Sequence, residues 1–178
     1  MKIILCSAAE CERCQPELVG LLRDAVQHGA SMGFTWPLAE DEAESFWRGV
    51  AESVAADNKR LLLALDENGK VLGGAQLALE RRSNGRHRAE VQKVLVWHAA
   101  RRRGVGAALM AALEREAMVE GRTLLFLDTS VGAGGAEEFY RQLGYQVAGG
   151  IPDYAADPDG QLRANVIFYK RLPRASPS

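Results

Sequence analysis

The sequence predicts one domain of mixed α/β structure, with a mostly antiparallel central sheet flanked by helices. Stretches with apolar residues at helical spacing alternate along the chain with short, β-prone stretches. Asn-Gly pairs at 68–69 and 84–85 are typical of tight hairpins and join three consecutive strands in antiparallel fashion. With 178 residues, of which 47% are hydrophobic, the chain can bury one core. We therefore expect a single domain over residues 1–172, followed by a frayed tail at 173–178.

The N-terminal part of the chain is predicted to form a strand and then two helices. Residues 2–7, which are apolar from Ile3 to Cys6, indicate a strand. Pro16 suits the first turn of a helix, in which leucine and valine recur at helical spacing until Gly29 ends it. A second amphipathic helix is predicted over 38–57, and its Phe-Trp stripe is expected in the core. The segment between them, 28–34, is either a simple connection or a loop that a ligand approaches.

Strands dominate the remainder of the chain. Composition and turn signals predict strands at 60–65, 71–79, 89–97, 123–129, 145–148 and 164–170. Helical spacing predicts one helix that starts at residue 104 and another over 136–143. A proline-containing loop with Asp159-Gly160 is expected over 151–163. The predicted order is therefore β-α-α-β-β-β-α-β-α-β-β.

A short basic turn joins the central strand to the helix that follows it. The turn carries Arg101, Arg102 and Arg103, and then Gly104 and Gly106. The first turn of a helix has backbone N–H groups without intrahelical partners and a partial positive charge. Because glycine lacks a Cβ, a phosphate can approach the main chain closely there. The pattern therefore predicts a site for a phosphate or pyrophosphate, although it is not a Walker A loop.

This turn and a second motif resemble the signatures of a known family. The run Arg101-Arg102-Arg103-Gly104-Val105-Gly106 resembles the Arg/Gln-x-x-Gly-x-Gly/Ala signature of the GNAT family of N-acetyltransferases. Residues 136–145 resemble the second signature of that family, Ala-x-x-x-Tyr-x-x-x-Gly-Phe/Tyr. The resemblance implies the GNAT fold and acetyl-CoA as the cosubstrate. It also implies coenzyme contacts from the strand, at Val94, Leu95 and Val96, and from the turn, at Arg101, Arg102, Arg103, Gly104, Val105, Gly106 and Ala107.

Within the family, the chain is most similar to the tabtoxin-resistance acetyltransferases. The stretches that carry this resemblance lie at 29–34, 88–93, 127–129 and 158–160. Those enzymes acetylate the amino group of a small toxin that contains a β-lactam. The resemblance implies a small primary amine as the acceptor, such as a toxin or an antibiotic. The sequence also leaves open a peptide N-terminus or a lysine as the acceptor, and a non-catalytic module that senses acyl-CoA.

Acetyl transfer to an amine needs a base for the ammonium proton and an acid for the departing thiolate. Glu90 opens the central strand and Asp128 ends the next core strand, so the two carboxylates converge on one cleft if these strands are neighbours. The resemblance places Tyr140 near the sulfur of the coenzyme as the candidate acid. The alternatives are a pairing of Glu90 with Arg88 or Arg86, a helix or turn cap for Asp128 and a packing role for Tyr140.

Residues on predicted loops are candidates for contact with the acceptor: Met32, Phe34, Trp36, Asp153 and Tyr154. Loops often determine specificity, because they vary on a scaffold that stays fixed. An acidic residue such as Asp153 suits a cationic amine, although the acids of loops are more often simply solvated.

Composition and charge exclude several other classes of protein. The net charge of −1 indicates no general surface for nucleic acids. No apolar run is long enough to span a membrane and no signal peptide is recognised, so we expect a cytoplasmic protein. Cys11 and Cys14 form a C-x-x-C pair without a second pair, so no metal is expected. Because Cys6 and this pair lie outside both signatures, we expect direct transfer in a ternary complex. A homodimer is left open.

Overall fold

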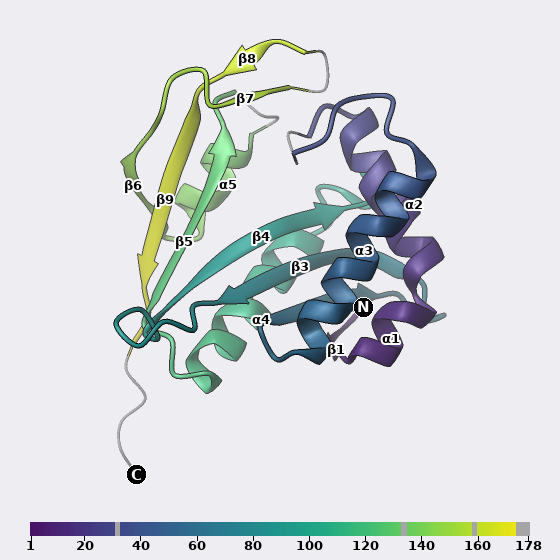
Figure 1. The fold of residues 1–178 in the computed structure, drawn as a ribbon, viewed down its shortest axis with the longest axis horizontal. Helices are drawn as coiled ribbons and strands as arrows, with labels where there is room; N and C mark the ends of the chain where they lie inside the picture. The colour runs from purple at the N-terminus through teal and green to yellow at the C-terminus, as the bar shows by residue number, and fades with distance from the viewer. Residues whose placement is uncertain (31–32, 133–134, 158–159, 174–178) are drawn as a thin grey trace.

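A seven-stranded sheet runs through the computed structural model, which describes residues 1–30, 33–132, 135–157 and 160–173 (Figure 1). The strands follow the order β1-β2-β3-β4-β5-β9-β6. Their bounds are Lys2–Cys6 (β1), Lys59–Leu65 (β2), Val71–Leu79 (β3), Arg88–Val96 (β4), Leu124–Ser130 (β5), Gln146–Gly149 (β6) and Asn165–Arg171 (β9). Neighbours are antiparallel, except that β4 and β5 are parallel. The mostly antiparallel sheet is thus confirmed, and most of the predicted tail, 174–178, lies outside the described residues.

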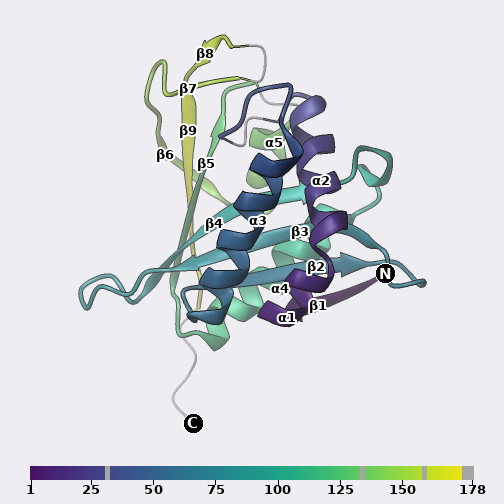
Figure 2. The same cartoon turned by 45° about the vertical axis from the view of Figure 1, so that its right-hand side comes forward.

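Helices cover both faces of the sheet (Figures 1 and 2). They are Ala8–Arg13 (α1), Gln15–Gln27 (α2), Glu40–Ala55 (α3), Val105–Val119 (α4) and Ala136–Gln142 (α5), with a 3₁₀ turn at His98–Ala100 (η1). Leu61 and Leu63 of β2 belong to the core under α1, α2 and α3, whereas Leu62 and Ala64 belong to the core under α4. One apolar strand therefore serves two cores, because its side chains alternate between the faces. Within the described part of the chain, no helix is long and apolar enough to cross a membrane.

Two segments differ from the sequence-based expectation. The first is α1, which the sequence analysis does not predict. Its start is stabilised by reciprocal hydrogen bonds: Ser7 N donates to the Glu10 carboxylate at 2.8 Å, and Glu10 N donates to Ser7 Oγ at 3.3 Å. The second is the predicted loop 151–163, which contains a small antiparallel pair, Ala155–Ala156 (β7) with Leu162–Arg163 (β8). Along the chain, the strands therefore follow the predicted order up to β6. The extra hairpin, β7–β8, comes before the last strand, β9.

A β-bulge interrupts the pairing of β3 with β4 at Lys93. Gln76 pairs with Gln92 and Gly74 with Leu95, so β4 has one residue more than β3 across this step. Lys93 has a φ of 48°, in the left-handed region that residues with a side chain rarely adopt. A bulge bends the strand, shifts its alternation and re-aims side chains, and bulges are common next to active sites.

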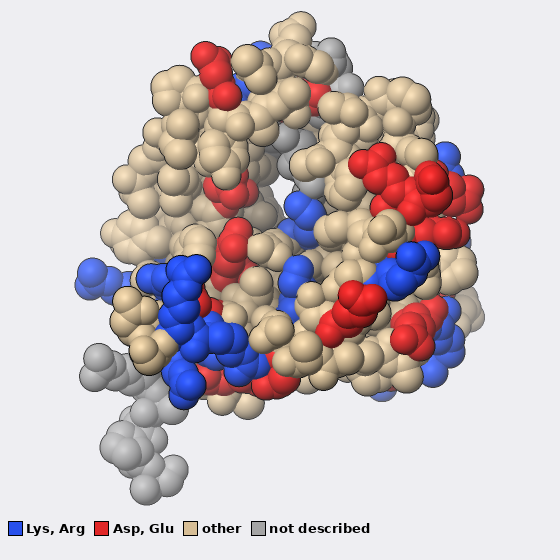
Figure 3. Space-filling model, in the orientation of Figure 1, with Lys and Arg blue, Asp and Glu red and all other residues tan. Residues whose placement is uncertain are grey.

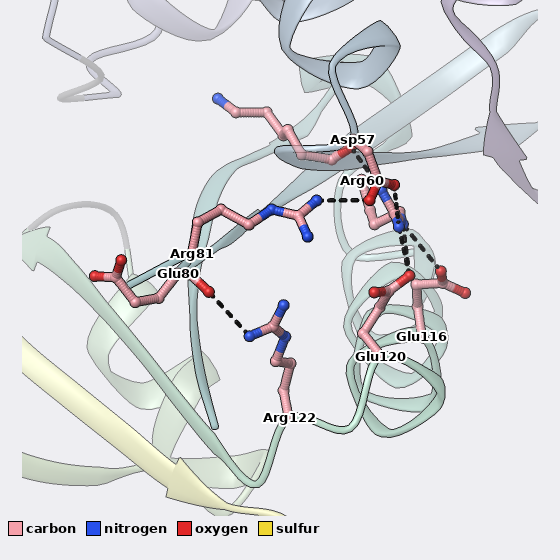
Figure 4. Close-up of polar contacts among 8 residues, drawn as sticks. Asp57, Arg60, Glu80, Arg81, Glu116, Glu120 and Arg122 are labelled. Atoms are coloured by element: carbon pink, nitrogen blue, oxygen red, sulfur yellow. Dashed lines mark hydrogen bonds and ion pairs between the residues drawn. The ribbon is translucent and has the colours of Figure 1, made fainter. Parts of the chain in front are cut away.

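Polar contacts fix the C-terminal end of α4 against the sheet (Figure 4). Arg60 of β2 pairs with Glu116 and Glu120 of α4, with N–O distances of 3.5 and 2.5 Å. Arg122, which is buried, donates from Nη1 to the carbonyl of Glu80 at 3.0 Å. These contacts fix the axis of α4, and with it the position of the first turn of this helix.

Candidate active site

The strands β4 and β5 separate along their length. They pair only over Arg88–Glu90 and Leu124–Phe126, whereas β4 continues to Val96 and β5 to Ser130. Figures 1 and 2 show the two strands diverging from this junction. The space-filling view shows a hollow in this face of the molecule, lined by both acidic and basic side chains (Figure 3). Within the described residues, the facing edges of β4 and β5 beyond the junction are unpaired, and we call the space between them the cleft.

Glu90 lies at the junction and belongs to a chain of hydrogen bonds that crosses three strands. Its carboxylate accepts a hydrogen bond from Gln92 Nε2 at 2.9 Å. Gln92 Oε1 accepts from Lys59 Nζ at 2.9 Å, and the same ammonium donates to Gln76 Oε1 at 2.9 Å. Gln76 is fully buried, so this polar chain is built into the sheet and is not a surface contact. The network holds the Glu90 carboxylate in one orientation.

The two predicted carboxylates have partners other than the alternatives that the sequence suggests. Arg88 pairs with Glu80 across the hairpin, with an N–O distance of 3.0 Å, and Glu90 is bound by a glutamine instead. Asp128 lies inside β5 and its carboxylate accepts from Asn165 Nδ2 at 3.2 Å, so it does not cap a turn. Both carboxylates are therefore held by neutral amide groups.

Lys93 is a cleft residue that the sequence analysis does not single out. Its Nζ lies 5.9 Å from the centre of the Phe46 ring of α3, so the bulge directs this side chain toward α3. Burial lowers the pKa of Lys93, while the negative charges of Asp128 and Glu90 oppose that shift. Burial also lowers the pKa of Lys59, and the positive charge of Lys93 adds to the effect. The cleft therefore brings two ammonium groups close to the two predicted carboxylates.

The sequence contained a signal for these polar residues. Gln76 interrupts the apolar run of β3, and Gln92 and Lys93 stand next to each other in β4. Consecutive polar residues break the period-two pattern of a strand and indicate a bulge. The face that such residues take depends on the register with the neighbouring strand, which the sequence does not specify.

Tyr140 lies on α5 with only 9% of its surface exposed. Its ring packs against Phe139, Tyr145 and Phe168, with centroid distances of 5.2, 5.9 and 5.8 Å. Burial raises the pKa of Tyr140, and the negative charge of Asp128 raises it further. The phenol is therefore protonated at neutral pH, and Asp128 is close enough to influence its pKa. Packing and proton donation, the two roles considered for Tyr140, are compatible in this position.

The two glycines of the predicted pyrophosphate turn have different surroundings. Gly104 precedes α4 with a φ of 80°, and a Cβ added there would meet no atom within 4 Å. The main chain at Gly104 is therefore open to a ligand. A Cβ on Gly106 would lie 3.3 Å from the ring of Phe139, so this glycine allows α5 to pack closely against α4. The role predicted for both glycines, close approach of a phosphate, fits the surroundings of Gly104 better.

The residues around Gly104 fit an anionic pyrophosphate. Arg102 and Arg103 are exposed, and Arg101 is half-buried, with its Nε donating to the carbonyl of Val96 at 3.4 Å. The first-turn N–H groups of α4 add donors that have no partner within the helix. Backbone donors, the helix dipole and flexible cations at one place form a typical anion site.

The predicted acceptor contacts lie on two segments above the cleft. Figures 1 and 2 both show the loop after α2 beside the β7–β8 hairpin. Phe34 is half-buried and packs edge-on against Phe46, with ring centres 5.4 Å apart. The exposed members of the predicted set are Trp36, Asp153 and Tyr154. Met32 lies outside the described residues.

The N-terminal cysteines are neutral thiols at pH 7. Burial raises the pKa of Cys6 to about 12 and that of Cys11 to about 11, which disfavours the thiolate that metals and disulfide exchange need. The described residues contain no group of three or more His, Cys, Asp or Glu side chains that could hold a metal ion. Cys11 lines a cavity of about 180 Å³ between α1 and α3, which none of the predicted site residues lines.

Comparison with known sequences identifies a family and a relative of this chain. A sequence model of the acetyltransferase (GNAT) family matches residues 22–145. A curated relative, an uncharacterized N-acetyltransferase encoded in the hisH-hisA intergenic region of Azospirillum brasilense, is 33% identical over 107 residues, or 59% of this chain. The match spans 61% of the length of that relative.

Solved structures share the fold over nearly the whole chain. The ribosomal-protein-alanine N-acetyltransferase from Brucella melitensis superposes with a TM-score of 0.78 at 22% identity, over 97% of this chain and 100% of that protein. A putative acetyltransferase from Salmonella typhimurium, solved with its cofactor acetyl-CoA, superposes with a TM-score of 0.77 at 20% identity, over 100% of this chain and 98% of that one. Fold and family match agree: this chain belongs to the GNAT family of acetyltransferases.

Proposed function

We propose that this protein is an acetyl-CoA-dependent N-acetyltransferase that acetylates a primary amine of a small molecule by direct transfer in a ternary complex. The observation that carries the proposal is the divergence of β4 from β5 beyond Glu90. This divergence leaves a strand edge and the turn at Gly104 on one side of the cleft, Glu90 at its junction and Asp128 on the opposite strand. Membership of the GNAT family supports the same activity.

The coenzyme has a matching set of groups on this chain. Residues 101–107 would hold the pyrophosphate, since Gly104 is open and the arginines and first-turn N–H groups are donors. The unpaired edge of β4 at 94–96 would hold the pantetheine arm through its main chain. When bound, acetyl-CoA supplies an acetyl group whose C–S bond breaks as the C–N bond to the amine forms.

Three side chains are proposed to transfer protons during the reaction. We propose that Glu90 and Asp128 hold the ammonium of the acceptor and remove its proton, directly or through water. Tyr140 gives a proton to the departing thiolate. Its raised pKa keeps the proton on the phenol at neutral pH, but it also makes the phenol a weaker acid, so water can share this role. Main-chain N–H groups next to the bulge polarise the acetyl carbonyl, because a bulge frees groups from the ladder.

Two alternative functions would each require a different feature of the structure. A peptide or lysine acceptor needs an open groove, and the segments above the cleft, which bear Trp36 and Tyr154, favour a smaller acceptor. A sensor of acyl-CoA needs no proton-transfer groups. The influence of Glu90 and Asp128 on the pKa of Lys93, and of Asp128 on that of Tyr140, supports a shared catalytic site. The cytoplasmic location, a homodimer, and a toxin or antibiotic as the acceptor stay predictions.

A screen over primary amines tests the proposal. Purified protein is mixed with acetyl-CoA and panels of small amines and short peptides, and the release of free thiol is measured together with the mass of the product. We expect thiol release with at least one small amine and a product heavier by one acetyl group. Tight binding of acetyl-CoA with no thiol release for any amine would favour the sensor, and turnover of peptides alone would favour the peptide acceptor.

A further inference from the structure

Four charged side chains without an ion-pair partner lie in or beside the cleft: Lys59, Lys93, Glu90 and Asp128. Among the residues that the structure describes, none of the four takes part in an ion pair. Lys59 donates to the side-chain oxygens of two glutamines, and the carboxylates of Glu90 and Asp128 each accept from a neutral amide nitrogen. Asp128 is exposed, whereas Lys59, Lys93 and Glu90 are half-buried, and a charge that loses part of its hydration without a counterion is costly. A cleft that keeps unpaired charges of both signs therefore suits a ligand that brings charges of its own.

Lys93 has the least compensated charge of the four. Phe46 covers one side of its ammonium at 5.9 Å from the ring centre, a contact that offsets only part of the lost hydration. Burial lowers its pKa even though Asp128 and Glu90 act in the opposite direction. Lys59 differs, because two of its three N–H groups already donate to Gln76 and Gln92 at 2.9 Å each. The N–H groups of the Lys93 ammonium are therefore the ones available to donate to a ligand.

The position of Lys93 makes it part of the acceptor side of the cleft. Its side chain lies toward α3, on whose Phe46 the predicted acceptor residue Phe34 also packs. The bulge that places Lys93 there requires a φ of 48°, a conformation that is unfavourable for a lysine by itself. Asp128 supplies a negative charge on the opposite wall of the cleft, which β5 forms. Glu90 supplies a negative charge at the junction of β4 and β5.

We propose that the acetyl acceptor is a zwitterion of the amino-acid type, and that Lys93 binds its carboxylate while Glu90 and Asp128 take its ammonium. This inference rests on the proposed acetyltransferase function and names the substrate class of the same site. A carboxylate beside Lys93 would supply the missing counterion. An amine without a carboxylate would leave Lys93 uncompensated and would be discriminated against by about 10- to 100-fold.

Matched acceptors and matched variants test the inference. The acceptors are pairs that differ only by the carboxylate: tyrosine and tyramine, tryptophan and tryptamine, histidine and histamine, lysine and cadaverine. The variants are Lys93→Met, which keeps the length and removes the charge, Lys93→Arg, which keeps the charge, and Lys70→Met, an exposed lysine in the β2–β3 turn. For each pair we measure kcat/KM by thiol release, and the binding of the acceptor to protein loaded with coenzyme A by calorimetry.

The wild type should prefer the amino acid to its amine in at least one pair. Lys93→Met should lower kcat/KM and affinity for that amino acid by about tenfold or more, whereas those for the amine should not fall, because the uncompensated charge is gone. Lys93→Arg should retain part of the preference, and Lys70→Met should behave as the wild type. Thermal melts of each variant show whether the fold is intact.

Equal losses on the amino acid and on the amine in a folded Lys93→Met variant would overturn the inference, as would a wild type that prefers the amines. The calorimetric arm separates this inference from the proposed function. If amino acids bind in a Lys93-dependent manner but no thiol is released, the acetyltransferase proposal fails and the anion site stands. If amines are acetylated without regard to their carboxylates, the proposed function stands and the zwitterion is excluded.

Discussion

Asn165 donates a hydrogen bond from Nδ2 to Asp128 Oδ2 at 3.2 Å. Its other amide atom, Oδ1, accepts from the backbone N of Ile151 at 2.8 Å. Asn165 is 4% exposed, so this amide is a buried link between β5 and the segment that leads to the β7–β8 hairpin. Through it, the orientation of a proposed catalytic carboxylate is coupled to a loop above the cleft.

We predict that Asn165 positions Asp128. Asn165→Ala should lower kcat/KM by about tenfold and leave the affinity for acetyl-CoA within about twofold, because the turn at Gly104 is untouched. Asn165→Asp sets a second carboxylate beside Asp128, which raises the pKa of the pair and should move the ascending limb of the pH profile to higher pH. A profile that stays in place for Asn165→Asp would mean that Asp128 is not the base. Asn68→Ala, in an exposed turn, is the control.

The two carboxylates should act on the same step. Glu90→Gln and Asp128→Asn are each expected to reduce kcat/KM by about 100-fold at neutral pH, because either change removes a charge that holds or deprotonates the amine. The double variant should be far less than multiplicatively worse, since both residues serve one step. Multiplicative losses would show independent roles, and a collapse of acetyl-CoA binding would show that the residues are structural.

Tyr140→Phe should keep the affinity for acetyl-CoA and lower kcat by about tenfold, because only the proton for the thiolate is lost. The effect is modest because burial and Asp128 raise the pKa of this phenol, so it is not a strong acid. Tyr145→Phe is a matched control, since Tyr145 is also buried, also has a raised pKa and packs in the same cluster. Full activity of Tyr140→Phe would leave this residue with a packing role.

We predict that the charge of Lys93 lowers the free energy of unfolding at neutral pH. Its pKa is lowered from 10.5 by burial, so the unfolded chain binds more protons than the folded chain between the lowered value and 10.5. Stability therefore rises with pH through that window, and the charged ammonium is a penalty below it. The other charged groups near Lys93 are Asp128, Glu90 and Lys59. In thermal melts at pH 7, Lys93→Met should have a higher melting midpoint than the wild type. This difference in midpoint should shrink as the pH approaches 10.5. Equal midpoints at pH 7 would contradict the claim that the charge of Lys93 lowers stability.

Much of the fold is readable from the sequence because each element has a local cause. The turn at Asn68-Gly69 and the strand-turn-helix that begins at 89 depend on neighbouring residues only, and the structure has them where they are predicted. The connection at Asn84-Gly85 is longer than a tight hairpin, because it spans residues 80–87. The helix α1 was also readable, because Ser7 and Glu10 have the spacing of a capping box. The β7–β8 hairpin has only two residues in each strand, too few for a period to be recognised.

The polar lining of the cleft is harder to predict, because it depends on register. The carboxylates at 90 and 128 could be proposed because the sequence places them near the start and the end of predicted strands, although both lie inside the observed strands. Lys93 reaches the α3 side only because β4 gains one residue relative to β3, and Lys59 meets Gln76 and Gln92 only across aligned strands. Asn165 joins Asp128 across β9 and β5, 37 residues apart in the chain. Non-local pairing of this kind has no signature in a local pattern.

Binding of acetyl-CoA at the β4–α4 turn is the most direct test of the central claim, and calorimetry of Gly104→Val measures it. Valine would fill the open space over the main chain and oppose a φ of 80°. Gly69→Val is the matched control, because Gly69 has a φ of 81°, equally open surroundings and a place in the β2–β3 turn. We predict that Gly104→Val weakens acetyl-CoA binding by at least about tenfold, whereas Gly69→Val leaves it unchanged. Equal affinities of the wild type and a folded Gly104→Val variant would contradict the assignment of this turn, and with it the placement of the whole site.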